Sequence, residues 1–210
     1  MSTGHLVSDV VIRPALAEDA NFIFSLVNDC YTRKAVSLEG IQSAIARRHS
    51  VMLVASIVSD AKPNGKRKNV VRQYESIGAL SATIADTADP YRHAFDLNFC
   101  AVAESYRRRG VATRLLRRAC QRVVNREIVS RVSEFNLVGQ QFLRSCGLSC
   151  DIGSKVKCGD GDGGDVYVFR SESSDAVERA VCYRCAKYEK KTDSYMDANI
   201  GECCGRFVEN

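Results

Sequence analysis

The sequence predicts an α/β fold in which helices flank a mixed, largely antiparallel central sheet. Two observations support this: stretches typical of strands alternate with stretches typical of amphipathic helices, and polar loops rich in Gly, Pro or Asn separate them. The 210 residues suit one domain with an appendage, and a hydrophobic content of 45% can fill a core. We therefore expect one domain over residues 1–172 and a short cysteine-rich extension over 173–210.

The elements are expected in a mixed order along the chain. In the first half they are a strand at 7–13, a helix at 16–31, a second helix at 37–47 with Ser37 as its N-cap, and a buried strand at 51–58. After a polar loop at 59–68 come strands at 75–85 and 93–102, a helix from 111 to about 125, a strand at 128–134, a helix at 136–146 and two closing strands. Gly147 is expected at the C-terminal end of the last of these helices.

The most informative segment joins a strand to a helix at residues 99–112. An apolar strand ending at Val102 leads into three arginines and Gly110, and an amphipathic helix starts directly afterwards. Free backbone N–H groups and the positive end of the helix dipole meet there, which suits a phosphate group. Gly110 lets the backbone approach such a ligand closely, and the small Ala112 keeps the first helical turn uncrowded.

The order Arg107-x-x-Gly110-x-Ala112 resembles the pyrophosphate loop of the GNAT superfamily, the acyl-coenzyme A-dependent N-acyltransferases. Downstream, residues 136–148 resemble that family's second motif, and residues 11–20 are similar to its first strand and helix. The resemblance implies a GNAT-type sheet, acetyl-CoA as co-substrate, and direct transfer of acetyl to a primary amine in a ternary complex. The cofactor contacts that it implies are at Cys100, Ala101, Val102, Arg107, Arg108, Arg109, Gly110, Val111, Ala112 and Asn136. For the last of these, capping of the helix that follows is an alternative.

Two residues of the strand before the arginines are candidates for catalysis. In the family a backbone N–H of this strand stabilises the carbonyl oxyanion, which the resemblance places at Cys100 or its neighbours, with the thiol itself a packing residue. Asp96 stands three residues before the Phe-Cys-Ala-Val tetrapeptide, where the histone-acetyltransferase branch has a glutamate general base. Period-2 alternation predicts that Asp96, Asn98, Cys100 and Val102 share one face. An ordinary carboxylate, an arginine partner, or His93 as the base are the alternatives.

The proton donor expected for the leaving thiolate is missing. Members of the family often carry a tyrosine four residues before the glycine of the second motif, and Leu143 holds that place here. Neither Leu143 nor Phe142 donates a proton. A second functional hypothesis therefore stays open: an acyl-CoA-binding protein with weak or no catalysis, whose tail docks a partner.

The cysteines of the tail are candidate zinc ligands. A C-x-x-C pair followed by a second cysteine pair resembles a zinc ribbon, and the four residues are Cys182, Cys185, Cys203 and Cys204. Adjacent cysteines suit one tetrahedral ion less well than C-x-x-C, so Cys158 or an acidic side chain is an alternative fourth ligand. Structural zinc, reduced thiols and disulfides all remain open interpretations.

Charge and composition narrow the partners and the location. The net charge of +5 is concentrated in residues 62–72 and 107–131. Polyanionic coenzyme A accounts for part of this basic patch, and the lack of interleaved aromatic residues disfavours nucleic acid. No apolar run approaches the ~20 residues of a membrane span. The first residues lack the features of a signal peptide, so a cytoplasmic or nuclear location is expected.

The sequence does not indicate which amine is the acceptor. A small molecule and a protein are both open, and the Phe-Cys-Ala-Val tetrapeptide favours a protein lysine or N-terminus only slightly. The oligomeric state is not predicted.

Overall fold

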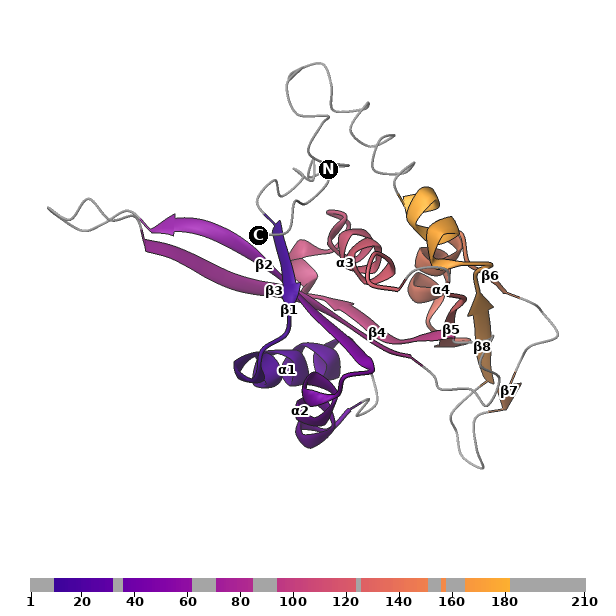
Figure 1. The fold of residues 1–210 in the computed structure, drawn as a ribbon, viewed down its shortest axis with the longest axis horizontal. Coiled ribbons are helices and arrows are strands. Elements are labelled where there is room, and N and C mark those ends of the chain that lie inside the picture. Colours follow the sequence, from indigo (N-terminus) through magenta and orange to yellow (C-terminus); the bar gives the residue numbers. More distant parts are fainter. Residues whose placement is uncertain are drawn as a thin grey trace, which may run out of the picture.

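An eight-stranded sheet runs through the molecule, with helices on both of its faces (Figure 1). The computed structural model describes residues 10–31, 36–61, 71–84, 94–123, 126–150, 156–157 and 165–181. The strands are β1 (Val10–Pro14), β2 (Ser50–Ala61), β3 (Val71–Ile84), β4 (Phe95–Val102), β5 (Ile128–Ser133), β6 (Ser149–Cys150), β7 (Val156–Lys157) and β8 (Asp165–Arg170). Their order across the sheet is β1-β2-β3-β4-β5-β8-β6, and β7 also pairs with β8.

The pairing directions confirm the predicted mixed, largely antiparallel sheet. Among the described strands, β4 and β5 form the one parallel pair, and the other pairs are antiparallel. A parallel pair needs a crossover connection, and α3 (Val111–Cys120) provides it between β4 and β5. This crossover is the strand–turn–helix unit that the sequence singles out.

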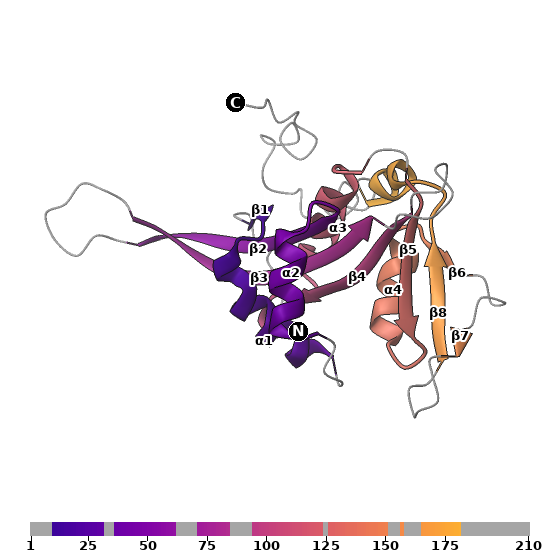
Figure 2. The same cartoon turned by 60° about the horizontal axis from the view of Figure 1, so that its bottom comes forward.

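Two separate cores lie on the two faces of the sheet. Helices α1 (Ala20–Cys30) and α2 (Leu38–Ala46) cover one face, and α3 and α4 (Leu137–Ser145) cover the other (Figures 1 and 2). The α1 side is filled by fully buried side chains such as Ile23, Val27 and Val54. The α3 side is the larger core, and Leu115 and Leu116 are fully buried in it. None of the helices in the described ranges is long and apolar enough to cross a membrane.

The hairpin of β2 and β3 is longer than the sequence predicts. The apolar pattern predicts strands at 51–58 and 75–85, whereas the two strands pair from Ser50↔Thr83 out to Ala61↔Val71. Their outer part projects from the body of the molecule as an arm (Figure 1). An apolar pattern in the sequence indicates only the part of a strand whose side chains face a core. Backbone pairing does not need a core, so the two strands remain paired along the arm.

A further helix at 174–181 directly follows β8. The Ser173 hydroxyl accepts a hydrogen bond from the Ala176 N–H over 3.2 Å, which caps the start of this helix. Val177 and Val181 are fully buried in the same core as α3. The expected boundary at 172/173 stays a prediction, and the first residues beyond it pack onto the domain.

Candidate active site

The parallel strands β4 and β5 pair only at their N-terminal ends. Their register covers Phe95↔Ile128 to Leu97↔Ser130, where the Ser130 hydroxyl donates to the Leu97 carbonyl over 3.4 Å. Beyond this point β4 continues to Val102 beside β3, and β5 continues beside β8. The two strands therefore diverge, as Figure 2 shows, and the C-terminal half of β4 has no ladder partner on its β5 side among the described residues.

A β-bulge at Asn98 divides β4 into two halves with opposite side-chain alternation. Ser81 pairs with Phe99 while the next residue of β3, Ala82, pairs with Leu97, so Asn98 is the extra residue. Leu97 belongs to the core under α3, whereas Phe99 belongs to the core under α1. Without the bulge, residues two apart would have stayed on one face.

The bulge overturns the prediction that Asp96, Asn98, Cys100 and Val102 share a face. Cys100 and Val102 pack against the core on the α3 side. Asp96 lies on the α1 side, where it pairs with Thr83 of β3. The Asn98 amide donates to the Thr83 hydroxyl on that same side over 2.8 Å. Simple alternation fails because the extra residue shifts the phase of the strand by one.

The backbone amide of Cys100 points away from β3. At the end of β4 the Ala103 N–H donates to the Ile77 carbonyl over 2.9 Å, which makes this a hydrogen-bonded antiparallel pair. Such pairs alternate along the ladder, so the amides of Cys100 and Val102 face the side from which β5 has diverged. The Cys100 N–H therefore points into the divergence between β4 and β5.

The Cys100 side chain has the character of a packing residue. Burial raises the pKa of its thiol to about 12, and the nearby thiols of Cys146 and Cys30 add to this effect. The group is therefore protonated at neutral pH, and a thiol is a poor nucleophile compared with a thiolate. This environment is compatible with the expectation that Cys100 acts through its backbone N–H, with the thiol as a packing group.

The turn between β4 and α3 has the backbone shape of an anion-binding site. Arg108 and Gly110 both adopt positive φ, at 62° and 79°, and Gly110 is the N-cap of α3. A glycine has no side chain to accept from the amides of the first helical turn, and a Cβ placed at Gly110 would meet no atom within 4 Å. Successive N–H groups and the helix dipole thus meet open space, which fits a pyrophosphate group.

Two of the three turn arginines make contacts within the protein. Arg107 donates from Nε to the Val102 carbonyl over 3.0 Å and from Nη2 to Cys30 Sγ over 3.4 Å. The Arg109 guanidinium lies 5.5 Å from the centre of the Tyr106 ring. Arg107 therefore ties the turn to the end of β4 and to the end of α1.

Helix α3 holds the turn against the sheet. The predicted inner face is confirmed, because Val111, Leu115, Leu116, Ala119 and Val123 are all buried. Its first turn approaches β3 closely at Gly78, where a Cβ would lie 3.2 Å from Val111 Cγ1 and 3.2 Å from the Ala101 carbonyl. This contact places the start of α3 against β3 and the end of β4.

Asn136 caps helix α4. Its Oδ1 accepts from the Gly139 N–H over 2.9 Å, and a Cβ at Gly139 would come 2.8 Å from Asn136 Nδ2. The buried Gln140 fastens the same junction by donating to the Ser133 and Glu134 carbonyls over 3.1 and 3.0 Å. The capping alternative is thus realised, while a contact of Asn136 with the cofactor stays a prediction.

Leu143 is a core residue on the inner face of α4. It is 3% exposed and packs among the side chains under α3. The position that would carry a proton-donating tyrosine is thus filled with apolar packing.

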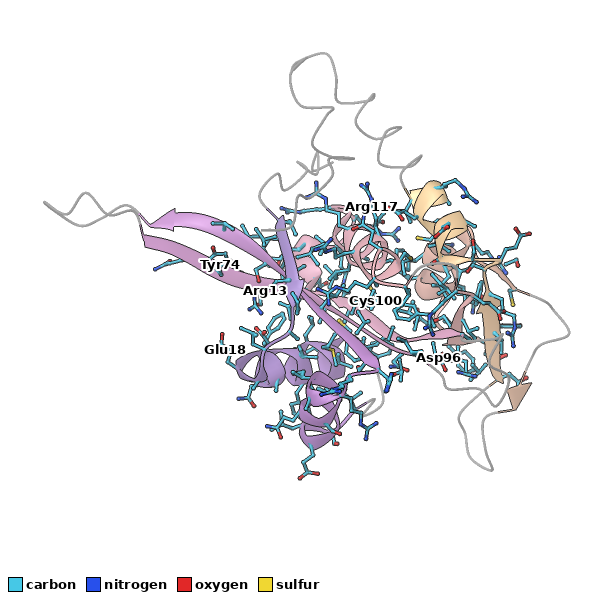
Figure 3. All side chains as sticks on the ribbon, viewed as in Figure 1. Arg13, Glu18, Tyr74, Asp96, Cys100 and Arg117 are labelled. Atoms are coloured by element: carbon cyan, nitrogen blue, oxygen red, sulfur yellow. The ribbon has the colours of Figure 1, made fainter. Side chains whose placement is uncertain are left out.

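Asp96 forms an ion pair with Arg131 of β5 at the start of the divergence. The Asp96 side chain is 26% exposed and that of Arg131 is 58% exposed. The partners of Asp96 and Cys100 on β3, Thr83 and Leu80, are three residues apart because Asn98 is an extra residue, and three residues of strand at ~3.3 Å each give about 10 Å. Figure 3 shows the two residues at different points of β4. A proton from a reacting group at Cys100 therefore reaches Asp96 only through water.

Sequence reasoning missed Tyr31, whose phenol lies close enough to Cys100 for the backbone of that residue to affect the pKa of the phenol. Burial raises the pKa of this phenol to about 12, while the Cys100 amide acts in the opposite direction. The two residues lie far apart in the chain, on different elements. Nothing in the local pattern around either residue indicates the contact.

Several predicted residues lie outside the described part of the chain. These are the four tail cysteines Cys182, Cys185, Cys203 and Cys204, the alternative ligand Cys158, and the alternative base His93. Within the described ranges, no group of three or more His, Cys, Asp or Glu side chains is arranged to hold a metal ion. The zinc site of the tail stays a prediction.

Comparisons with solved structures place the fold among acetyltransferases. Arabidopsis thaliana NAA60 in complex with a bisubstrate analogue is 18% identical with a TM-score of 0.61, over 77% of this chain and 97% of that chain. The same protein with acetyl-CoA has a TM-score of 0.59 at 18% identity, over 77% and 97% of the two chains. Ard1 from Thermoplasma volcanium has a TM-score of 0.58 at 14% identity, over 77% and 96%. At these identities the likeness shows the fold.

The family follows from the sequence match. A comparison with curated proteins finds no match. The model of the acetyltransferase (GNAT) family matches residues 31–148, which is more than half of the chain and includes the turn, α3 and α4. The resemblance that the motifs indicate is thereby confirmed, and the protein belongs to the GNAT acetyltransferase family.

Proposed function

We propose that this protein is an N-acetyltransferase that transfers acetyl from acetyl-CoA to a primary amine by direct attack in a ternary complex. The observation that carries the proposal is the divergence of β4 from β5 beside the open N-terminus of α3. Among the residues that the structure describes, it leaves the Cys100 amide without a strand partner on its β5 side, a few residues from a turn that suits an anion. One ligand with a pyrophosphate and a thioester matches both features.

The expected reaction uses the two faces of β4 differently. The pyrophosphate binds at the turn ending in Gly110, on the α3 side, and the thioester carbonyl lies at the Cys100 N–H. The amine approaches from the α1 side, which is the face of Asp96. Its lone pair forms the new C–N bond, and the negative charge that develops on the carbonyl oxygen is held by the Cys100 N–H. Holding both substrates in this geometry supplies much of the acceleration.

The later steps follow from the groups around the intermediate. Collapse of the intermediate returns the carbonyl and breaks the C–S bond, with its electron pair leaving on sulfur. The proton lost by nitrogen passes through water to the Asp96 carboxylate, which we propose as the general base. The leaving thiolate takes a proton from solvent, because Leu143 supplies none. Coenzyme A thiol is acidic enough to leave in this way.

Two assays test the proposal. Calorimetry with acetyl-CoA measures binding, and thiol release measured with a panel of amines, lysine peptides and free N-terminal peptides identifies the acceptor class. We expect binding together with release on at least one acceptor, and the tetrapeptide at 99–102 favours a peptide slightly. Initial velocities at varied concentrations of both substrates should give intersecting double-reciprocal lines. Parallel lines would indicate a covalent acetyl-enzyme and contradict direct attack.

A second candidate function rests on the buried Leu143. With apolar packing at the position of the usual tyrosine, the fold is also compatible with an acyl-CoA-binding protein of little catalytic activity. Tight acetyl-CoA binding without thiol release across the whole acceptor panel would favour this function over the enzyme.

A further inference from the structure

A row of polar side chains crosses the α1 side of the sheet where β4 begins to diverge from β5. Asn98 donates to Thr83 of β3, and Asp96 pairs with Arg131 of β5. The side chains that follow on this side of β3 and β4 are apolar and buried under α1, namely Ala79, Phe99 and Ala101. Asn98 and Arg131 are exposed and Asp96 is partly exposed, so the polar row is accessible from solvent.

The carboxamide of Asn98 is held in one orientation by β3. Its Nδ2 donates to the Thr83 hydroxyl over 2.8 Å and to the Ser81 hydroxyl over 3.4 Å. These two bonds use both hydrogens of the amide. The Oδ1 atom is on the other arm of the planar group and accepts no hydrogen bond from the residues that the structure describes. Asn98 thus presents an oxygen acceptor on an exposed part of the α1 side.

Asn98 lies between the two groups of β4 that the proposed reaction uses. It is two residues from Cys100, which at ~3.3 Å per residue is at most about 7 Å. Asp96 is two residues away in the other direction, and its Oδ2 atom pairs with Arg131. The bulge puts the Asn98 side chain on the α1 side, whereas the Cys100 thiol packs on the α3 side. The carboxamide therefore faces the side from which we expect the amine to approach.

A primary amine has the bonding pattern that suits an oxygen acceptor at this place. The neutral amine that attacks has two N–H donors besides its lone pair. With one N–H on Oδ1 and the other on the water that leads to Asp96, the lone pair is directed at the carbonyl carbon. Positive charge develops on the nitrogen as the C–N bond forms, which strengthens a hydrogen bond from its N–H to a carboxamide oxygen.

We propose that Asn98 binds the acceptor: its Oδ1 accepts a hydrogen bond from the primary amine and holds the nitrogen beside the thioester carbonyl. The inference rests on the proposed function, because it concerns the acceptor of that reaction. Asn98 exchanges no proton, so the bonds made and broken are those of the amine, the carbonyl and the thiolate described above. The ligand class is a primary amine or its ammonium form.

The kinetic test compares Asn98→Ala with Gln73→Ala on the amine that the acceptor panel identifies. Gln73 also has an exposed carboxamide, on the arm and ten residues before Thr83 in β3. We expect Asn98→Ala to lower kcat/KM for the amine about 10- to 100-fold, the range of a hydrogen bond to a charged group, with Kd for acetyl-CoA changed less than about threefold. Gln73→Ala should keep both values. Thermal unfolding verifies that both variants are folded.

Asn98→Asp separates the oxygen acceptor from the bonds that brace it. The aspartate keeps an acceptor oxygen, and the Ser81 and Thr83 hydroxyls can donate to its other oxygen. We expect this variant to retain kcat/KM for the amine within about threefold. A loss as large as that of the alanine variant would show that the Nδ2 bonds to β3 are responsible, and it would overturn the role of Oδ1.

A binding measurement decides the question without any acetyl transfer. Protein labelled with ¹⁵N in its asparagine side chains is saturated with coenzyme A and titrated with n-butylammonium or with tetramethylammonium, which has the same charge but no N–H. The Nδ2 resonance of Asn98 is identified as the one that is missing in Asn98→Ala. It should shift with n-butylammonium and stay in place with tetramethylammonium. No shift with either ion, or equal shifts with both, would overturn the inference.

The outcomes separate this inference from the proposed function. Unchanged kcat/KM in Asn98→Ala, with active unchanged protein, would overturn the role of Asn98 and leave the acetyltransferase intact. If coenzyme A binds but no acceptor reacts, the proposed function fails, and the titration with the two ammonium ions still decides whether Asn98 binds an amine.

Discussion

Arg107 donates a hydrogen bond from Nε to the backbone carbonyl of Val102 over 3.0 Å, so the arginine turn is tied to the strand that carries Cys100. The same guanidinium contacts Cys30 at the end of α1. One side chain therefore connects three segments of the candidate active site: the turn before α3, the strand that carries Cys100, and the end of α1. This arrangement assigns Arg107 a structural role besides any contact with phosphate.

Replacing Arg107 by methionine should cost stability as well as affinity. The Val102 carbonyl loses its charged partner, which we expect to lower the free energy of unfolding by about 1–3 kcal/mol. Urea unfolding without ligand measures this loss, and calorimetry with acetyl-CoA measures the accompanying rise in Kd. Arg48→Met, on an exposed turn after α2, is the control for loss of one surface charge. A higher Kd with unchanged stability would mean that Arg107 contacts phosphate without bracing the turn.

Asp96→Asn should lower kcat, because an amide does not accept the proton that a carboxylate does. Stability should fall by less than about 1 kcal/mol, since both partners of the Asp96–Arg131 ion pair are partly exposed. Arg131→Met breaks the same ion pair and keeps the carboxylate, so it should retain most of kcat in the same thiol-release assay. An equal loss of kcat in the two variants would mean that the ion pair, and not a general base, is responsible.

Asn136→Ala should lower the free energy of unfolding by about 1 kcal/mol, because the Gly139 N–H loses its cap. Asn136→Ser keeps a capping oxygen and should retain most of the stability. Chemical unfolding of both variants checks the cap. Acetyl-CoA affinity of the serine variant tests the predicted cofactor contact: a tenfold loss would show that the Asn136 amide binds the cofactor, and an unchanged Kd would leave capping as its role.

Leu143→Tyr is expected to destabilise the protein and not to restore a proton donor. Leu143 is 3% exposed in a packed core, and enlarging such a residue costs about 1–3 kcal/mol through forced displacements. Leu143→Ala leaves a cavity and should cost about 2–5 kcal/mol. Unfolding curves measure both changes. A tyrosine variant with raised kcat and unaltered stability would contradict the packing described for α4.

The N-terminal segment should become less stable in acid because of Asp19. Arg13 donates to both Asp19 oxygens over 2.6 and 2.8 Å, and the Leu16 N–H donates over 2.7 Å. Burial acts to raise the pKa of Asp19, but these hydrogen bonds together outweigh it, so the pKa is lowered. A lowered folded-state pKa gives stability that is present above the unfolded-state value, near 4, and is lost as pH falls through the folded-state value.

Asp19→Asn removes this contribution and provides the measurement. Urea unfolding between pH 2 and pH 7 should show a smaller loss of stability on acidification in the variant than in the unchanged protein. At pH 7 the variant should be less stable by about 2 kcal/mol, the range of hydrogen bonds to charged groups. Equal pH dependence of the two proteins would contradict the role given to the carboxylate.

The local features of this protein were determined by the sequence alone. The turn from Arg107 to Gly110, the buried face of α3 and the cap at Asn136 depend on residues within a few positions of one another. Their conformational preferences are set by backbone sterics, helical periodicity and short-range hydrogen bonds. These are the parts of the fold that the sequence predicts correctly, and they lie within the residues that show the family.

The arrangement of the catalytic groups was decided by the tertiary structure. No glycine or proline marks the bulge at Asn98, which arises from the pairing of β4 with β3 and moves Asp96 to the face opposite the Cys100 side chain. The contacts of Cys30 with Val102 and Arg107 depend on how α1 packs on the sheet. Both features result from contacts between segments distant in the chain, where local propensity carries no information about which residues meet. The sequence therefore determined the strand–turn–helix unit that identifies the family, and the packing of α1 and β4 decided which side chains surround Cys100.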